Sequence, residues 1–364
     1  MPFHNLPIGD LHCDTAFHLL AGKSLDSPEL QVNLPCMKKA NIRLQVFAFF
    51  LPSAIPQGHR FEIVQRMIDH FEQEVEQHRE DIAICRDSQE VAKAQKENKI
   101  AAILSVENGM AIENDLKKLE TLYQRGIRMM TIIHTRSNEW VISSSDSDPA
   151  FDGLTAFGEK VIRTMNDLGM IVDLSHSHDR AVQKVLSVTN SPVIASHSCV
   201  HQICPTSRNL TDKLIRGIAG SGGLVGINLY PGFLDFHYNQ LLNKRARDLF
   251  IELGEGERKA GTDVVEIVNL YARINKKVTA LMATDPVPVS RIIDHIQYIR
   301  DLVGDDYIAF GSDFDGVPDL PEGILACNGF ARIRQAMFDS DFSLSTIKKI
   351  SMDNFLRVFA QVVG

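Results

Sequence analysis

The chain has 364 residues, a formal net charge of -8 and a pI near 5.9, so it repels polyanions on average and a nucleic-acid partner is not expected. Hydrophobic residues make up 44% and charged residues 23%, the balance of a globular protein that buries a large core. No apolar run is long enough to span a membrane and no secretion leader is visible, so we expect a cytoplasmic protein without a membrane partner. The six cysteines form no CxxC pair and are expected to be free thiols.

Short apolar segments rich in β-branched residues alternate along the chain with longer amphipathic ones. The clearest amphipathic segment runs from Phe61 to Val75, where apolar residues recur every three or four positions and predict a helix. Eight short segments predict buried parallel strands: Ile8–Asp14, Ile42–Phe50, Ile100–Glu107, Met129–His134, Met170–His176, Pro192–His197, Gly223–Leu229 and Tyr307–Asp313. Eight strands alternating with helices predict a single (β/α)8 TIM barrel over residues 1–364, with a doubly wound open sheet as the alternative.

One connection is longer than a single crossover helix requires. It runs from Tyr230 to about Val289 and contains a charged helical pattern at Asn243–Lys259 and an apolar-periodic one at Val264–Ile274. We interpret it as a helical insertion after the seventh strand. It lies either over the mouth of the barrel or on the surface without a role in the site.

Histidine, aspartate or glutamate ends almost every predicted strand. In a barrel the C-terminal strand ends meet on one face, where active sites sit. Burying a carboxylate or an imidazole costs free energy unless the group is paired or binds a metal. His12 and Asp14 end the first strand, and alternation along a strand directs both side chains into the mouth. Imidazole and carboxylate are both good zinc ligands.

Three further candidate ligands end the third, fifth and sixth strands. Glu107 has two oxygens with which to bridge two metal ions. His176 and His197 are separated by 197 − 176 = 21 residues, which leaves room for one helix and two loops, so their imidazoles should be neighbours and form a second metal half-site. Alone, each residue also has a structural explanation, such as a helix cap for Glu107. Their joint placement favours a metal centre.

Three other residues are candidates for handling the substrate. His134 ends the fourth strand and is either a donor to a substrate carbonyl or a satisfied interior histidine. Asp313 ends the eighth strand and is either a general base and acid or a turn carboxylate. Arg208 follows the sixth strand and can pair with a substrate carboxylate, although a lone loop arginine is usually a solvated charge.

With these residues identified, the chain resembles the renal (membrane) dipeptidase family of the amidohydrolase superfamily, and the resemblance covers nearly its whole length. Six motifs carry it: His12-x-Asp14, Val106-Glu107-x-Gly109, Asp173-Leu174-x-His176, Ser196-His197-Ser198, Ser207-Arg208-Asn209 and Gly311-x-Asp313-Phe314-Asp315-Gly316.

The resemblance implies a metal-dependent hydrolase with two zinc ions. His12 and Asp14 would bind one zinc and His176 and His197 the other, with Glu107 bridging both. The two ions would share a hydroxide that attacks the scissile carbonyl of a dipeptide.

The resemblance also implies how a dipeptide is held. His134 would contact the carbonyl oxygen, Arg208 the C-terminal carboxylate, and Asp313 would carry the proton. Members of the family cleave dipeptides, and many accept a D-residue at the C-terminal position. Relatives are commonly dimers, so a homodimer is one expected state.

Three other functions were weighed. Related hydrolases of lactones, phosphotriesters or cyclic amides often bridge their metals with a carboxylated lysine, but no lysine ends a predicted strand here. A mononuclear deaminase would leave Glu107 or one histidine without a role. An inactive barrel acting as a scaffold would be expected to lack a ligand or the proton carrier, and none is missing.

Overall fold

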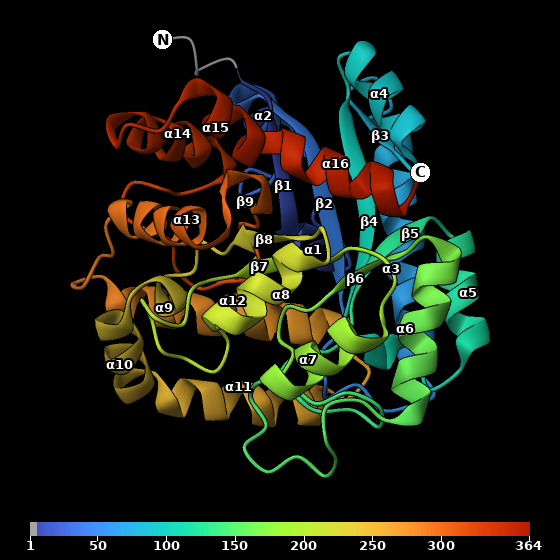
Figure 1. Ribbon diagram of the computed structural model, residues 1–364. Coiled ribbons are helices and arrows are strands. Elements are labelled where there is room, and N and C mark those ends of the chain that lie inside the picture. Colours follow the sequence, from blue (N-terminus) through green and yellow to red (C-terminus); the bar gives the residue numbers. More distant parts are fainter. Residues whose placement is uncertain (1–5) are drawn as a thin grey trace.

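The computed structural model describes residues 6–364, and within them nine parallel strands form one sheet (Figure 1). The strands are β1 Ile8–Cys13, β2 Ile42–Phe50, β3 Ile82–Ile84, β4 Ile100–Glu107, β5 Ile127–Thr131, β6 Ile171–Asp173, β7 Val193–Ser198, β8 Leu224–Ile227 and β9 Ile308–Phe310. Their order is β2-β1-β9-β8-β7-β6-β5-β4-β3, and β2 also pairs with β4. That last pairing closes eight strands into a barrel and leaves β3 outside it, against the start of β4.

The predicted (β/α)8 barrel is therefore confirmed, and the open-sheet alternative is excluded. Each of the eight predicted strands is present, but three of them end three residues earlier than predicted: β5 at Thr131, β6 at Asp173 and β9 at Phe310. His134, His176 and Asp313 consequently lie in the loops that follow these strands and not on the strands themselves. The short strand β3 was not predicted.

Helices follow the strands and form the outer layer. They are α1 Thr15–Leu19, α2 Leu34–Ala40, α3 Arg60–Gln77, α4 Ser88–Lys96, α5 Leu116–Gln124, α6 Ala156–Leu168, α7 Asp179–Val188, α8 Asp212–Gly220, α9 Pro231–Leu234, α10 Phe236–Arg245, α11 Arg247–Ala260, α12 Val264–Met282, α13 Ser290–Val303, α14 Phe330–Asp339, α15 Leu344–Lys348 and α16 Asn354–Val362. The predicted helix at Phe61–Val75 lies within α3, whose buried face includes Val64, Met67 and Phe71.

The interior of the barrel is closed at the amino ends of the strands by the C-terminal segment. A core cluster contains side chains from all eight barrel strands together with Met352, Phe355, Val358 and Phe359. Arg357 on α16 donates to the backbone oxygens of Gly222 and Asp306, which precede β8 and β9, and α16 crosses this end of the strands in Figure 1. The opposite end of the barrel, at the carboxyl ends of the strands, is not closed by this segment and can hold a functional site.

The long connection after β8, the seventh barrel strand, is helical as predicted and contains α9 to α12. Leu242 of α10, Phe250 of α11 and Tyr271 of α12 line the same cavity as Glu107 and His134. The insertion therefore covers part of the barrel mouth and is not a surface excursion.

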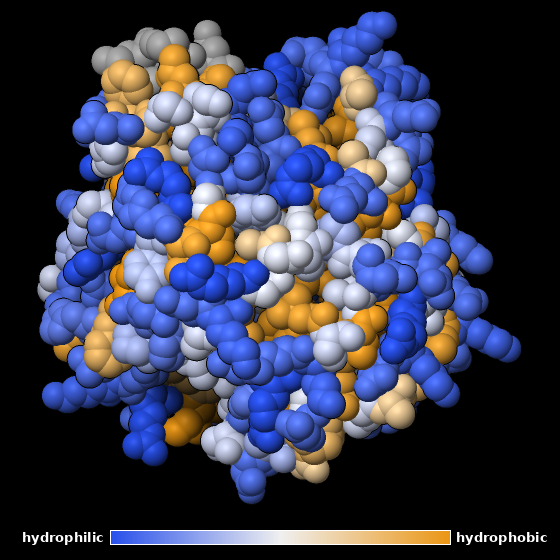
Figure 2. Space-filling model, in the orientation of Figure 1, coloured by the Kyte–Doolittle hydropathy of each residue, from blue (hydrophilic) through white to orange (hydrophobic). Residues whose placement is uncertain are grey.

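In the part of the chain from residue 6 onward, no helix is both long enough and apolar enough to traverse a bilayer. The face drawn in Figure 2 is mostly hydrophilic, with apolar side chains in separate small patches.

Candidate metal centre

The two carboxylate oxygens of Glu107 face two different groups of ligands. Glu107 is the last residue of β4 and is 2% exposed. Its Oε2 lies 3.5 Å from Nε2 of His12. Its Oε1 lies 3.1 Å from Nε2 of His176 and 3.5 Å from Nε2 of His197. This is the arrangement in which one carboxylate can bridge two cations.

The first group is built from the two ends of the sequence. Nε2 of His12 lies 3.7 Å from Oδ2 of Asp14 and 3.9 Å from Oδ1 of Asp313. His12 lies in β1, and Asp14 is the first residue after that strand. Asp313 follows β9, which pairs with β1. The closure of the barrel is therefore what brings these side chains together.

The second group is held by a network of buried hydrogen bonds. Nε2 of His176 and Nε2 of His197 are 3.0 Å apart. The Ser196 hydroxyl lies 2.7 Å from Nδ1 of His197 and donates to Oδ2 of Asp173 at 2.5 Å. Because the Ser196 hydroxyl donates its proton to the hydrogen bond with Asp173, its oxygen accepts a hydrogen bond from Nδ1–H of His197. Nε2 of His197 then keeps its lone pair for a cation.

Asp173 is a positioning residue that the sequence reasoning did not select. Its carboxylate is fully buried and accepts from the Thr131 and Ser196 hydroxyls and from the backbone N–H groups of Ser175 and Ser196. The signal that could have identified it is an acidic residue inside the predicted strand 170–176, at the start of the Asp-Leu-x-His motif. The loop that it supports holds His176 in a left-handed conformation with φ of 66°, a strain that is typical of functional positions.

Burial keeps three imidazoles of the site neutral. Desolvation lowers the pKa of His134 to about 3, and it lowers the pKa values of His176 and His197 well below the ordinary value. Burial is the largest single effect on His12 and acts to lower its pKa, but the neighbouring Glu107 and Asp14 carboxylates together outweigh it and raise that pKa well above the ordinary value. Neutral imidazole is the form that binds metal.

Two further observations show that the residues around Glu107 fit a metal centre. Nδ1 and Nε2 of His12 and Oδ1 of Asp14 are buried and have no hydrogen-bond partner, which is costly unless another ligand satisfies them. A Cβ on Gly316 would lie 2.0 Å from Oδ2 of Asp14 and 2.7 Å from Oδ1 of Asp313. Only glycine therefore leaves room for these oxygens to converge. Gly316 closes the last of the six sequence motifs but is a second supporting residue outside the eight predicted site residues.

Asp313 is oriented by a neighbouring amide. Nδ2 of Asn228 donates to Oδ2 of Asp313 at 2.8 Å, which leaves Oδ1 facing His12. Burial raises the pKa of Asp313, so its carboxylate is a better proton acceptor than an exposed one, and its φ of 64° is another strained conformation. Asn228, a third missed residue, was signalled only by a polar side chain near the end of the predicted seventh strand.

Arg208 is a buried cation whose hydrogen bonds go to neutral groups. Its guanidinium donates to Oγ of Ser198 and to the backbone oxygen of His197, each at 2.7 Å. Its Nε has no partner, and its Cζ lies 5.4 Å from the centre of the Phe233 ring, which lines the cavity. The structure thus places Arg208 beside the second ligand group, with donor capacity left for an anion.

A cavity of about 350 Å³ lies over these residues. Its floor includes Asp14, Glu107, His134, His176 and Asp313, and its walls include side chains of the insertion. The volume is at the lower end of the range for small-molecule sites and suits a compact ligand. All eight site residues predicted from the sequence therefore lie in or beside one space, and the roles assigned to them stay predictions.

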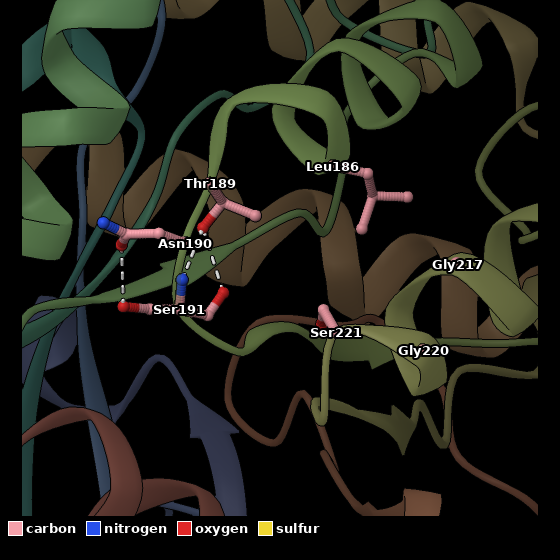
Figure 3. Close-up of a pocket in the computed structure, with 7 residues that line it drawn as sticks. All are labelled: Leu186, Thr189, Asn190, Ser191, Gly217, Gly220 and Ser221. Atoms are coloured by element: carbon pink, nitrogen blue, oxygen red, sulfur yellow. Dashed lines mark hydrogen bonds between the residues drawn. The ribbon is translucent and has the colours of Figure 1, made fainter.

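Another cavity lies at the opposite end of the barrel and carries none of this chemistry (Figure 3). It is lined by Leu186, Thr189, Asn190, Ser191, Gly217, Gly220 and Ser221, between the end of α7 and the end of α8. No titratable side chain lines it, and its hydroxyl groups bond locally, as Thr189 does to the Ser191 backbone. The candidate site is the cavity at the carboxyl ends of the strands.

The chain is similar in sequence to known dipeptidases and in fold to a solved metallopeptidase. The chain is 26% identical to Dipeptidase aclJ of Aspergillus oryzae over 385 residues, covering 98% of this chain and 78% of that protein. It is 28% identical to human Dipeptidase 3 over 268 residues, covering 72% of this chain but only 45% of the relative. A solved metallopeptidase of Rhodobacter sphaeroides shares the fold, with a TM-score of 0.79, 21% identity, and coverage of 98% of this chain and 99% of that one.

The family model for membrane dipeptidases, peptidase family M19, matches residues 3–363. This match confirms the resemblance drawn from the six motifs and the enzyme class that it implied, a metallopeptidase acting on dipeptides. The chain therefore belongs to the membrane dipeptidase family.

Proposed function

We propose that this chain is a zinc-dependent dipeptidase with two metal ions. The observation that carries the proposal is the position of Glu107, with one oxygen toward His12 and the other toward His176 and His197. In the proposed site His12 and Asp14 hold one ion, His176 and His197 hold the other, and Glu107 binds both. Nitrogen and carboxylate ligands in this number suit zinc. Bound metal ions would supply Lewis acidity and an acidified water.

The other residues position the substrate and move the proton. His134 borders the second ligand group, with Nε2 3.9 Å from Oε1 of Glu107, where it can donate to the oxyanion that forms at the scissile carbonyl. Asp313, oriented by Asn228, accepts a proton at Oδ1 and passes it to the leaving amine. Arg208 holds the C-terminal carboxylate through a charge-assisted pair.

The size of the cavity and the position of Arg208 support a dipeptide as substrate. A buried guanidinium beside the metal ligands selects a carboxylate close to the scissile bond, and the cavity of about 350 Å³ has little room for a longer peptide. The Rhodobacter sphaeroides relative was solved with a phosphinate mimic of L-Ala-D-Ala. We propose that this chain also accepts a D-residue at the C-terminal position.

The test is a screen of the purified protein, loaded with zinc, against dipeptides with L- and D-residues at the second position, together with metal analysis. We expect two metal ions per chain and hydrolysis that becomes much slower when the C-terminal carboxylate is amidated. A zinc-replete protein that cleaves no dipeptide would refute the proposal. Full activity with one metal ion per chain would refute the two-ion part alone.

A further inference from the structure

Arg208 and Phe50 lie on opposite sides of the barrel mouth. Around the closed sheet the strands follow one another as β1, β2, β4, β5, β6, β7, β8 and β9. Counted in either direction, β2 is four strands from β7, so the ends of these two strands face each other across the mouth. Arg208 follows β7 and bonds to its end residues, while Phe50 is the last residue of β2.

The β2 side of the cavity is an aromatic wall. Phe50 packs edge-on against Phe17 of α1 and Tyr271 of α12, with ring centres 5.2 Å and 5.8 Å away. Phe17 and Tyr271 are also in edge contact, at 6.1 Å, and all three rings line the cavity. The Phe50 ring centre lies 4.8 Å from that of His134, so the wall begins next to the residue proposed to contact the carbonyl.

The insertion adds no ionised group to this part of the cavity. Its lining residues on α10 to α12 are Asn239, Leu242, Asn243, Phe250, Leu253, Tyr271 and Asn275. The Tyr271 hydroxyl donates to Oε1 of Glu257 on α11 at 2.6 Å, so its polar end is satisfied within the insertion. A charged side chain placed against the three rings would lose its hydration, and the rings themselves offer it no hydrogen-bonding partner beyond the Tyr271 hydroxyl, which is already bonded to Glu257.

We propose that Phe17, Phe50 and Tyr271 form the subsite for the N-terminal side chain of the dipeptide, and that the enzyme prefers a large apolar or aromatic first residue. The inference rests on the proposed function. With the substrate carboxylate at Arg208 and the scissile carbonyl near Glu107 and His134, the first residue extends toward β2. There an apolar side chain gains from burial and from edge contacts between rings.

The experiment compares kcat/KM for Phe-Ala, Leu-Ala, Gly-Ala and Lys-Ala in the zinc-loaded protein. Both apolar substrates should exceed Gly-Ala by about tenfold or more, the discrimination that a hydrophobic pocket achieves, and Lys-Ala should be the poorest. Tyr271→Ala should reduce the ratio of Phe-Ala to Gly-Ala several-fold, whereas Tyr271→Phe should retain it. Because the ratio compares two substrates in one preparation, the fraction of folded enzyme cancels.

Phe236→Ala is the matched control, since Phe236 is an aromatic residue of the same insertion that is 39% exposed and lies outside the cavity lining. It should leave the ratio unchanged. If Tyr271→Ala does not fold, Tyr271→Leu serves in its place, with a smaller expected loss.

Hydrolysis of all four dipeptides at similar kcat/KM, or a ratio that Tyr271→Ala leaves unchanged, would overturn the inference while leaving the dipeptidase assignment intact. Failure to cleave any dipeptide would instead refute the proposed function.

Discussion

Substituting Gly316 by alanine tests whether the oxygens of Asp14 and Asp313 must converge. The φ of Gly316 lies outside the left-handed region, so alanine is compatible with the backbone and the added Cβ is the whole perturbation. That Cβ would stand 2.0 Å from Oδ2 of Asp14, whereas carbon and oxygen in ordinary contact are about 3.3 Å apart. Asp14 must therefore retreat by roughly 1 Å, several times the tolerance of about 0.2 Å on a metal–ligand distance.

We expect Gly316→Ala to fold but to bind its metal weakly. A displacement of about 1 Å at a reacting centre costs on the order of a hundredfold in rate, so kcat/KM for a dipeptide should fall by about that factor or more. The measurements are metal content, metal affinity in competition with a chelator, and steady-state kinetics. The thermal midpoint of the metal-free protein should change little, because the side chain that moves ends in a cavity.

Gly220→Ala is the matched control. Gly220 also lies outside the left-handed region, and nothing stands within 4 Å of the Cβ that alanine would add. This variant should keep two metal ions and wild-type activity. If Gly316→Ala keeps both metal ions and a kcat/KM within about threefold of wild type, then the proposed crowding at Asp14 is wrong.

Three other predictions concern single side chains. Asp313→Asn should lower kcat by about a hundredfold to ten-thousandfold while metal content stays at two ions per chain; an active variant would remove Asp313 from proton transfer. Arg208→Ala should raise KM roughly ten- to hundredfold for a free dipeptide, whereas an equal effect on the slow hydrolysis of an amidated dipeptide would contradict its role. Burial lowers the pKa of His295 to about 4, so stability from its neutral form is complete above the unfolded pKa near 6.5 and is lost as pH falls toward 4. At pH 5 the lost free energy of unfolding is about 2 kcal/mol. His295→Gln should therefore show a weaker dependence of urea stability on pH between 7.5 and 5. An identical pH dependence in the variant and the wild type would refute the burial of a neutral His295 as the cause.

The barrel was predictable from the sequence because its strands are buried on both faces and therefore read as continuous apolar runs. Residues 42–50 and 100–107 match β2 and β4 residue for residue. The ends of other strands were less predictable. The sequence pattern placed Asp173 and His176 in the same strand. In the structure the strand ends at Asp173, and the chain then adopts a left-handed conformation at His176.

The candidate metal ligands could be selected from the sequence because few residue types bind metals and because these residues end the predicted strands, and the structure brings them together. The residues that support them could not be selected in this way. Asn228, Asp173 and Gly316 act through hydrogen bonds or through the absence of a Cβ, and such roles depend on which strands become neighbours. The aromatic wall was also missed, because Tyr271 meets Phe17 and Phe50 only when the insertion folds back over the mouth.

The pairing of β1 with β9 has a consequence for how the enzyme matures. His12 leaves the ribosome about 300 residues before Asp313, the side chain that it approaches across this pairing. At about 5–20 residues per second, the growing chain carries His12 and Asp14 for roughly 15–60 s before Asp313 exists. The pocket in which Asp313 approaches His12 is therefore completed only after the final barrel strand has docked against β1.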